Sequence, residues 1–190
     1  ISYNEHIKAD LIKISRDIIP AVFNHPMYFG TDTLKELSPN NTEQFISFCN
    51  VLYEQLLTQK LLHPRKALLL SAATQDRLIK DECKKKLKRM LTEYGRGVFT
   101  FINDLGGFCK SQTLQLGSSY GTVNGFAIKE VDTLFGKTTN MIDDTQLESV
   151  LRICLTNNLL FTRETKQGEK HKEWTVFYLN RWICAAFSLP

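Results

Sequence analysis

The stretch that decides the fold is TQLESVLRICLTNNLLFTRETKQGEKHKEWTVFYL, residues 145–179. Thr145 and Glu148 have the spacing of a capping box at the start of a helix. A one-sided apolar stripe follows, typical of a helix that packs on a core: Leu147, Val150, Leu151, Cys154 and Leu155. We therefore predict a helix that ends near Asn157 and Asn158, since asparagine tolerates the left-handed conformation.

Two strands are predicted after this helix. Residues 159–165 and 174–179 are rich in aromatic and β-branched side chains, and the polar stretch 166–173 between them contains Gly168. Helix, strand, polar hairpin and strand form the core of a winged helix, with the helix as the recognition helix and the hairpin as the wing. Residues 113–190 are therefore predicted to form a winged-helix domain.

The sequence upstream of this unit predicts helices. Apolar residues recur at helical spacing over about 5–23, 45–59, 79–91 and 98–109. Asn41 with Gln44 reads as a capping pair before the second helix, and Ser71 as the cap of the third. A glycine- and serine-rich stretch at 117–125 marks the boundary and allows a short strand near residues 123–128. The fold class is thus mostly α, with a helical bundle at 1–112 followed by a winged-helix (α+β) unit with a two-stranded wing.

The bulk composition predicts a reduced globular protein. Hydrophobic residues make up 43% and charged residues 23% of the 190 residues, and no apolar run is long enough to span a bilayer. No secretory signal is visible, so we expect a cytoplasmic protein with no membrane contact. The chain begins at Ile1, and we expect it to be part of a longer protein. The cysteines are odd in number and form no CxxC pair, which argues against a zinc site and for free thiols on apolar stripes: Cys49, Cys83, Cys109, Cys154 and Cys184.

No group of residues indicates a catalytic site in this chain. Gly136-Lys137-Thr138 resembles the end of a phosphate-binding loop, but the motif needs a glycine where Val131 stands. The four histidines lie far apart along the sequence, and no nucleophile has an evident base. We expect neither a catalytic residue nor a metal site here.

Positive charge is concentrated in one helix. Residues 80–89 hold six basic and two acidic side chains, an excess equal to the net charge of the whole chain, +4. Such a cluster can replace counterions on a phosphate backbone, although charge runs are usually solvated helix faces. Four of these six basic residues and four more in the winged-helix region are the candidate nucleic-acid-binding residues: Lys84, Lys85, Lys88, Arg89, Arg152, Lys166, Lys170 and Lys172.

The winged-helix region has a weaker charge signal. Acidic residues nearly balance the basic residues of the wing, and Asp144 and Glu148 flank or occupy the presumed recognition helix, where Arg152 is the basic residue. Direct DNA contact and protein contact by this unit therefore remain open alternatives.

Several segments together resemble the C-terminal part of bacterial origin-recognition-complex-like AAA+ ATPases. They are YFGTDTL at 28–34, LSPNN at 37–41 with Gln44 and Phe45, VNGFA at 123–127, and NNLL at 157–160. The most specific segment is WTVFYLNRWIC at 174–184, followed by Phe187 and Leu189-Pro190. The resemblance spans nearly the whole chain.

This resemblance implies a lid-like role for residues 1–112 and an ATPase core upstream in the same chain. ATP and magnesium would then be cofactors of the full-length protein, which would be an ATPase, and this part would couple nucleotide state to DNA binding. Lid segments of the pattern Asn-Pro-Arg supply a nucleotide-sensing arginine, but residues 41–43 read Asn-Thr-Glu here, so Arg96 is the candidate. The resemblance also implies a possible setting in phage defence or mobile-element biology.

The alternative function is a protein-interaction or oligomerisation module without direct DNA contact. In that case Trp182 and the strand at 174–178 would pack on a neighbour, for example in a homo-oligomer.

Overall fold

The computed structural model describes residues 25–39, 41–65, 67–113, 115, 123–129, 135, 147–167 and 172–190, without the side chains of 165–167 and 172–173. The predicted helix at 5–23, the cap at Thr145 and the Gly136-Lys137-Thr138 segment lie outside the described residues.

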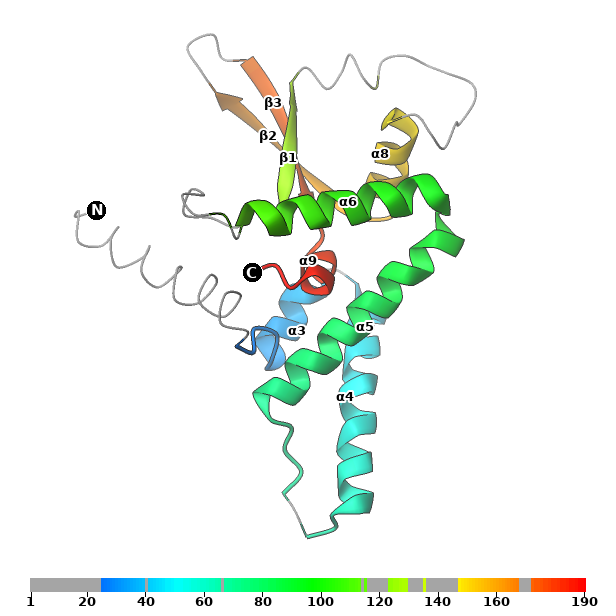
Figure 1. The fold of residues 1–190 in the computed structure, drawn as a ribbon, viewed down its shortest axis with the longest axis vertical. Helices are drawn as coiled ribbons and strands as arrows, with labels where there is room; N and C mark the ends of the chain where they lie inside the picture. The colour runs from blue at the N-terminus through cyan, green and yellow to red at the C-terminus, as the bar shows by residue number, and fades with distance from the viewer. Residues whose placement is uncertain are drawn as a thin grey trace, which may run out of the picture.

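Helices dominate the described chain (Figure 1). The elements in order are α3 (Thr31–Leu37), α4 (Thr42–Leu62), α5 (Ala72–Glu93), α6 (Gly95–Thr113), β1 (Gly125–Lys129), α8 (Leu147–Thr156), β2 (Leu160–Gln167), β3 (Lys172–Leu179) and α9 (Arg181–Phe187). The sheet lies at one end of the molecule, with α6 across its base, and α4 and α5 extend to the other end. Of these elements, α3 and α9 were not predicted from the sequence.

The two long helices begin where the sequence predicts. The Asn41 side chain accepts a hydrogen bond from the backbone N–H of Gln44 at 2.9 Å, and the Ser71 hydroxyl accepts one from the N–H of Thr74 at 3.2 Å. Gly95 has a φ of 85°, which a glycine adopts without strain, and it separates α5 from α6. Both predicted caps are confirmed.

The sheet has three antiparallel strands in the order β1-β3-β2, so the expected two-stranded wing is not confirmed. β1 pairs with β3 from Gly125 opposite Tyr178 to Lys129 opposite Trp174. The ring of Phe126 stacks on that of Phe177 with centroids 5.1 Å apart. A Cβ at Gly125 would lie 2.0 Å from the carbonyl oxygen of Phe177, so this close strand contact needs glycine. The sequence allowed a short strand near residues 123–128, and β1 lies there. Its pairing with β3, about 50 residues away, leaves no local signal and was not predicted.

The C-terminal helix α9 joins the sheet region to the long helices. Its cap is Asn180, whose side chain accepts from the N–H of Trp182 and donates to the carbonyl of Asn158 at 2.7 Å. α9 packs on both α5 and α6, and Gly106 leaves room for the ring of Phe187. One hydrophobic core therefore contains residues from both predicted regions, from Tyr28 to Leu189. The division at residues 1–112 and 113–190 stays a prediction.

The cysteines are free thiols, as predicted, and four of them are buried. Burial raises the pKa of Cys83, Cys154 and Cys184 to about 12 and that of Cys109 to about 11, because the thiolate is poorly solvated in the core. Cys49 is only half-buried. Among the described helices, none combines the length and apolar character needed to cross a membrane.

Candidate nucleic-acid interface

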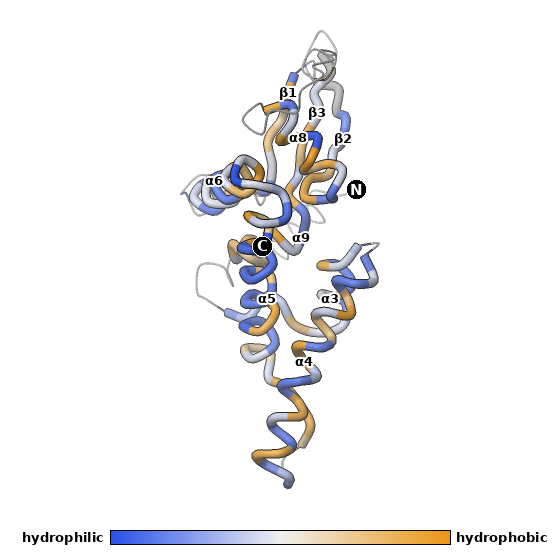
Figure 2. The backbone as a smooth tube through the Cα atoms, turned by 90° about the vertical axis from the view of Figure 1, so that its right-hand side faces the viewer, coloured by the Kyte–Doolittle hydropathy of each residue, from blue (hydrophilic) through white to orange (hydrophobic). Residues whose placement is uncertain are grey.

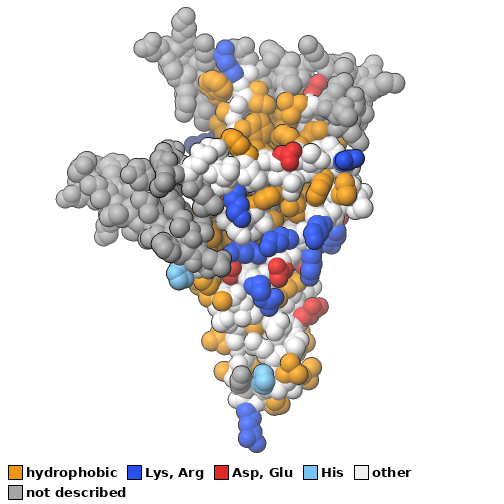
Figure 3. Space-filling view, in the orientation of Figure 1, with side chains coloured by type: hydrophobic (Ala, Val, Ile, Leu, Met, Phe, Trp, Pro, Cys, Tyr) orange, Lys and Arg blue, Asp and Glu red, His pale blue; other side chains and the backbone are white. Residues whose placement is uncertain are grey.

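The candidate interface is the solvent-facing side of α5. This helix buries one stripe in the core, formed by Ile79, Cys83, Leu87 and Met90. The basic residues between these positions consequently point outward, and all four predicted contacts on α5 are exposed: Lys84, Lys85, Lys88 and Arg89. Figure 3 shows basic side chains gathered on this side of the molecule.

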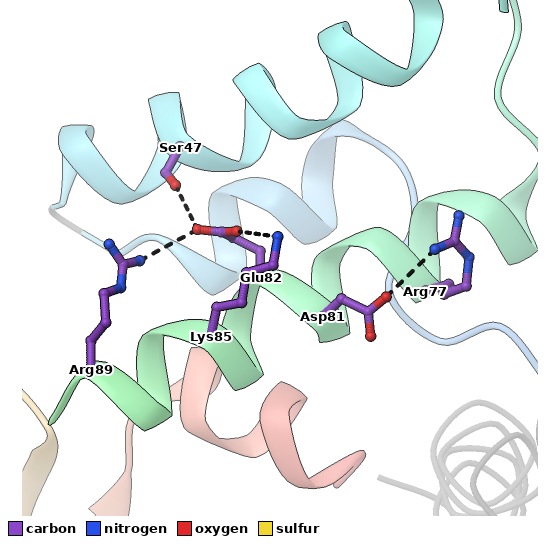
Figure 4. Close-up of polar contacts among 6 residues, drawn as sticks. All are labelled: Ser47, Arg77, Asp81, Glu82, Lys85 and Arg89. Carbon is purple, nitrogen blue, oxygen red and sulfur yellow. Dashed lines mark hydrogen bonds and ion pairs between the residues drawn. The ribbon is translucent and has the colours of Figure 1, made fainter. Parts of the chain in front are cut away.

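Two of these four cations share one carboxylate. Glu82 lies within 3.7 Å of the Lys85 amine and 3.5 Å of the Arg89 guanidinium, and its own side chain is only 14% exposed (Figure 4). The Ser47 hydroxyl of α4 also donates to Glu82 at 3.3 Å. Glu82 therefore offsets part of the positive charge of Lys85 and Arg89.

Lys84 and Lys88 differ from that pair. They lie one helical turn apart on the same face of α5, and neither forms an ion pair with any residue in the described ranges. They leave two full positive charges available to a phosphate backbone.

The remaining lysines of the cluster belong to the packing. Lys80 pairs with Asp76 at 2.8 Å and lies 5.6 Å from the ring centre of Tyr28. Lys86 donates to the Gln44 side chain at 2.6 Å and lies 4.6 Å from the ring centre of Trp182. Burial lowers the pKa of Lys86 because it removes water from the ammonium group. The basic excess of residues 80–89 is thus partly structural.

Among the predicted contacts in the second region, Arg152 is the one whose side chain is described, and it belongs to α8 rather than to α5. Arg152 on α8 bonds to Glu148 at 2.9 Å and to the carbonyl oxygen of Phe135 at 2.8 Å, and its guanidinium lies 5.0 Å from the Phe135 ring. Lys166 and Lys172 occupy the hairpin ends of β2 and β3. The side chains of both, and all of Lys170, lie outside the described residues.

A cleft of about 400 Å³ lies where α4, α5, the turn between α8 and β2, and α9 meet. Three acidic residues line it, Glu43, Glu82 and Glu93, together with two basic ones, Lys86 and Arg89. Because acidic side chains outnumber basic ones, the cleft does not favour phosphate. Arg96 is exposed in the first turn of α6 and is not a lining residue. Its assignment as a nucleotide sensor stays a prediction.

Two further observations restrict the chemistry. Trp182 is 2% exposed, so the expectation that it packs on a neighbour is wrong: its indole fills the core where α9 meets α5.

No group of three His, Cys, Asp or Glu side chains that could hold a metal ion occurs among the described residues.

The sequence carried one overlooked signal at this site. Glu82 precedes Lys85 by three residues and Arg89 by seven, which places all three on neighbouring turns of one helix. The neutralised pair could have been recognised from this spacing. The contact between Lys86 and Trp182 could not, because it joins residues 96 positions apart.

Comparisons with known proteins give one match. The searches of curated proteins and of solved structures found no match. The family model described as ORC-CDC6-like matches residues 1–190. The predicted resemblance is confirmed, and the chain belongs to the ORC-CDC6-like family.

Proposed function

We propose that this chain is the non-catalytic C-terminal part of an AAA+ ATPase and that it couples nucleotide state to DNA binding. Membership in the ORC-CDC6-like family indicates an AAA+ ATPase-related C-terminal region. The observation that supports DNA contact is the pair Lys84 and Lys88, which is exposed and without an ion-pair partner in the described chain. Contacts of this kind bind the phosphate backbone without reading sequence.

The α8–β2–β3 unit serves as a winged helix in this proposal, with β1 as a third strand. Arg152 is held by Glu148 and the Phe135 carbonyl, which argues against base reading by α8. The main phosphate contact is therefore assigned to α5, and Lys166, Lys170 and Lys172 would add contacts from the wing.

Nucleotide would act from an upstream ATPase core that binds ATP and magnesium. α5 is suited to transmit a change of state because it contacts both α4 and α9, which in turn pack on α3. Arg96 would sense nucleotide from the start of α6. A setting in phage defence or mobile-element biology belongs to the same proposal, and infection assays with the α5 variant below would test it.

The salt dependence of DNA affinity tests the α5 contact. The double variant Lys84→Glu and Lys88→Glu should lose affinity for duplex DNA, and the slope of log affinity against log salt should become shallower by roughly 1.8, about 0.9 per phosphate contact. The matched control is Lys35→Glu with Lys60→Glu, which reverses two exposed lysines on α3 and α4. It should leave the slope nearly unchanged.

Two results would contradict the proposal. One is an absence of duplex binding by the unmodified chain even at low salt. The other is an equal loss of affinity in both double variants, which would indicate a general effect of net charge rather than contact through α5.

The protein-contact alternative is favoured by a different surface. The outer face of α4 exposes apolar side chains, whereas the outer face of α5 is mainly polar and charged.

A further inference from the structure

The outer face of α4 carries a line of exposed apolar residues. Ile46 is 51% exposed, Tyr53 60%, Leu57 43% and Leu61 81%. On the opposite side of the helix, Phe48 is buried against the rest of the molecule. Figure 2 shows hydrophobic residues recurring along α4 down to the free end of the molecule. α4 thus carries apolar residues on two faces, as a helix packed on both faces does, but only one of its faces is packed against the rest of the molecule.

The spacing of this line is that of a helix–helix seam. With Asn50 included, the positions 46, 50, 53, 57 and 61 are separated by four, three, four and four residues. At roughly 100° per residue they fall within about 80° of the circumference, and they extend for about 22 Å along the axis. A second helix laid along α4 would contact every one of them.

The charges at the two ends of α4 select the orientation of that second helix. Glu43 lies in the first turn, whereas Lys60 lies in the last turn and Arg65 follows it. An antiparallel copy of α4 places the acidic end against the basic end at both extremities. A parallel copy places like charges together, which is unfavourable.

The surface is also self-complementary. In an antiparallel pair centred between residues 53 and 54, Ile46 of one copy lies beside Leu61 of the other, and Tyr53 lies near the two-fold axis. The same patch then serves both copies, as a two-fold interface requires.

We propose that two copies of this chain associate through their α4 helices, antiparallel, along the line from Ile46 to Leu61. The proposal is independent of DNA binding by α5. Because the contact is a single helix pair with Asn50 in its seam, we expect a reversible dimer with a dissociation constant on the order of micromolar.

Sedimentation of the 190-residue chain across a range of concentrations tests the association. Leu57→Lys should weaken the dimer at least about tenfold, because it places a charge in a seam that dimer formation would bury. The matched control is Leu91→Lys on α5, since Leu91 is 45% exposed and Leu57 is 43%. The control should dimerise as the unmodified chain does, and circular dichroism confirms that both variants are folded.

Disulfide trapping tests the orientation. Tyr53→Cys should form a covalent dimer with itself under mild oxidation. Ile46→Cys should not cross-link with itself, but should cross-link with Leu61→Cys when the two variants are mixed. The unmodified chain measures any background from the half-buried Cys49.

Three outcomes would overturn the proposal. They are a chain that stays monomeric well above micromolar concentration, a dimer that Leu57→Lys leaves intact, and an Ile46→Cys variant that cross-links with itself. The second would place the contact on another surface, and the third would indicate a parallel pair.

Discussion

α4 and α5 are nearly equal in length, at 21 and 22 residues, but they use their surfaces in opposite ways. α5 buries one apolar stripe and turns mainly polar and charged residues to solvent. α4 buries Phe48 and turns apolar residues from Ile46 to Leu61 outward. An exposed lysine is well solvated and needs no partner, whereas a continuous apolar line is stabilised when it is covered. We therefore expect α5 to contact phosphate and α4 to contact protein.

The largest expected difference is in the loss of stability when an apolar residue is truncated, either in the buried stripe of α5 or in the outer line of α4. Ile79→Ala should lower the free energy of unfolding by about 2–5 kcal/mol, because Ile79 is fully buried and a cavity would remain. Leu61→Ala should change it by less than about 0.5 kcal/mol in dilute solution, where the chain is monomeric. Urea unfolding measures both values. A similar loss in the two variants would show that the outer line of α4 is already covered within one chain.

Each long helix also holds one buried polar residue near its start. Asp76 on α5 accepts from the backbone N–H groups of Met27 and Tyr28, both at 2.9 Å, and pairs with Lys80. Asp76→Ala should cost about 2–3 kcal/mol, since these are hydrogen bonds to a charged group. Gln44→Ala on α4 should cost about 1–2 kcal/mol, because it leaves Lys86 without its neutral acceptor. Denaturant unfolding measures both losses. A larger loss of stability for Gln44→Ala than for Asp76→Ala would contradict this ranking.

The helix caps should matter about equally in the two helices. Asn41→Ala and Ser71→Ala should each cost about 1 kcal/mol, because each removes the acceptor for one N–H group of the first turn. Replacement by glycine at the same positions should cost only a few tenths of a kcal/mol. Thermal unfolding of the four variants separates the cap effect from the effect of losing a side chain.

The smallest effect on stability is expected from ionisation of the cysteines, which contributes nothing to the pH dependence near neutral pH. Cys49 on α4 is half-buried and should react first with a thiol reagent, whereas Cys83 on α5 should react only through unfolding. Burial raises the pKa of Cys83 from 9.0 to about 12, so the folded state holds its proton more tightly than the unfolded state. This contribution to stability is complete below pH 9 and is lost as the pH rises from 9 towards 12.

Labelling rates and unfolding curves between pH 7 and 11 check this expectation. Stability should be nearly constant to about pH 8.5 and should then fall. Rapid labelling of Cys83 at pH 7.5 in the folded protein would show that α5 is not packed as described.

Local patterns predicted much of the fold and less of the site. Asn41 and Ser71 act through hydrogen bonds to residues three positions away, so their roles are visible in the sequence. The same holds for the apolar stripes of α5 and α8. By contrast, β1 pairs with β3 across about 50 residues, and α9 is a seven-residue helix whose burial depends on α5 and α6. Such contacts depend on tertiary structure and leave no periodic signal.

The α4 helix shows the same limit in a different form. Leu57 belongs to the predicted apolar segment 45–59, but the structure leaves it 43% exposed on the outer face of α4. An apolar side chain predicts that its face of the helix is buried, but it does not predict whether the same chain or another molecule buries it. For the candidate site, exposure of Lys84 and Lys88 followed from the helical period, whereas the engagement of Arg152 required the position of Phe135.

The contact between Tyr28 and Leu189 has a consequence for how the protein is made. The Tyr28 hydroxyl donates to the Leu189 carbonyl, 161 residues later, and α9 covers α5 on the same side. α5 is synthesised roughly 90 residues before α9, an interval on the order of ten seconds at typical translation rates. Ribosome-bound chains that stop before Arg181 should therefore expose the Ile79 side of α5, and binding of a hydrophobic dye or a chaperone to such chains would measure it. Residues 181–189 thus complete the core around α5, whatever follows them in the chain.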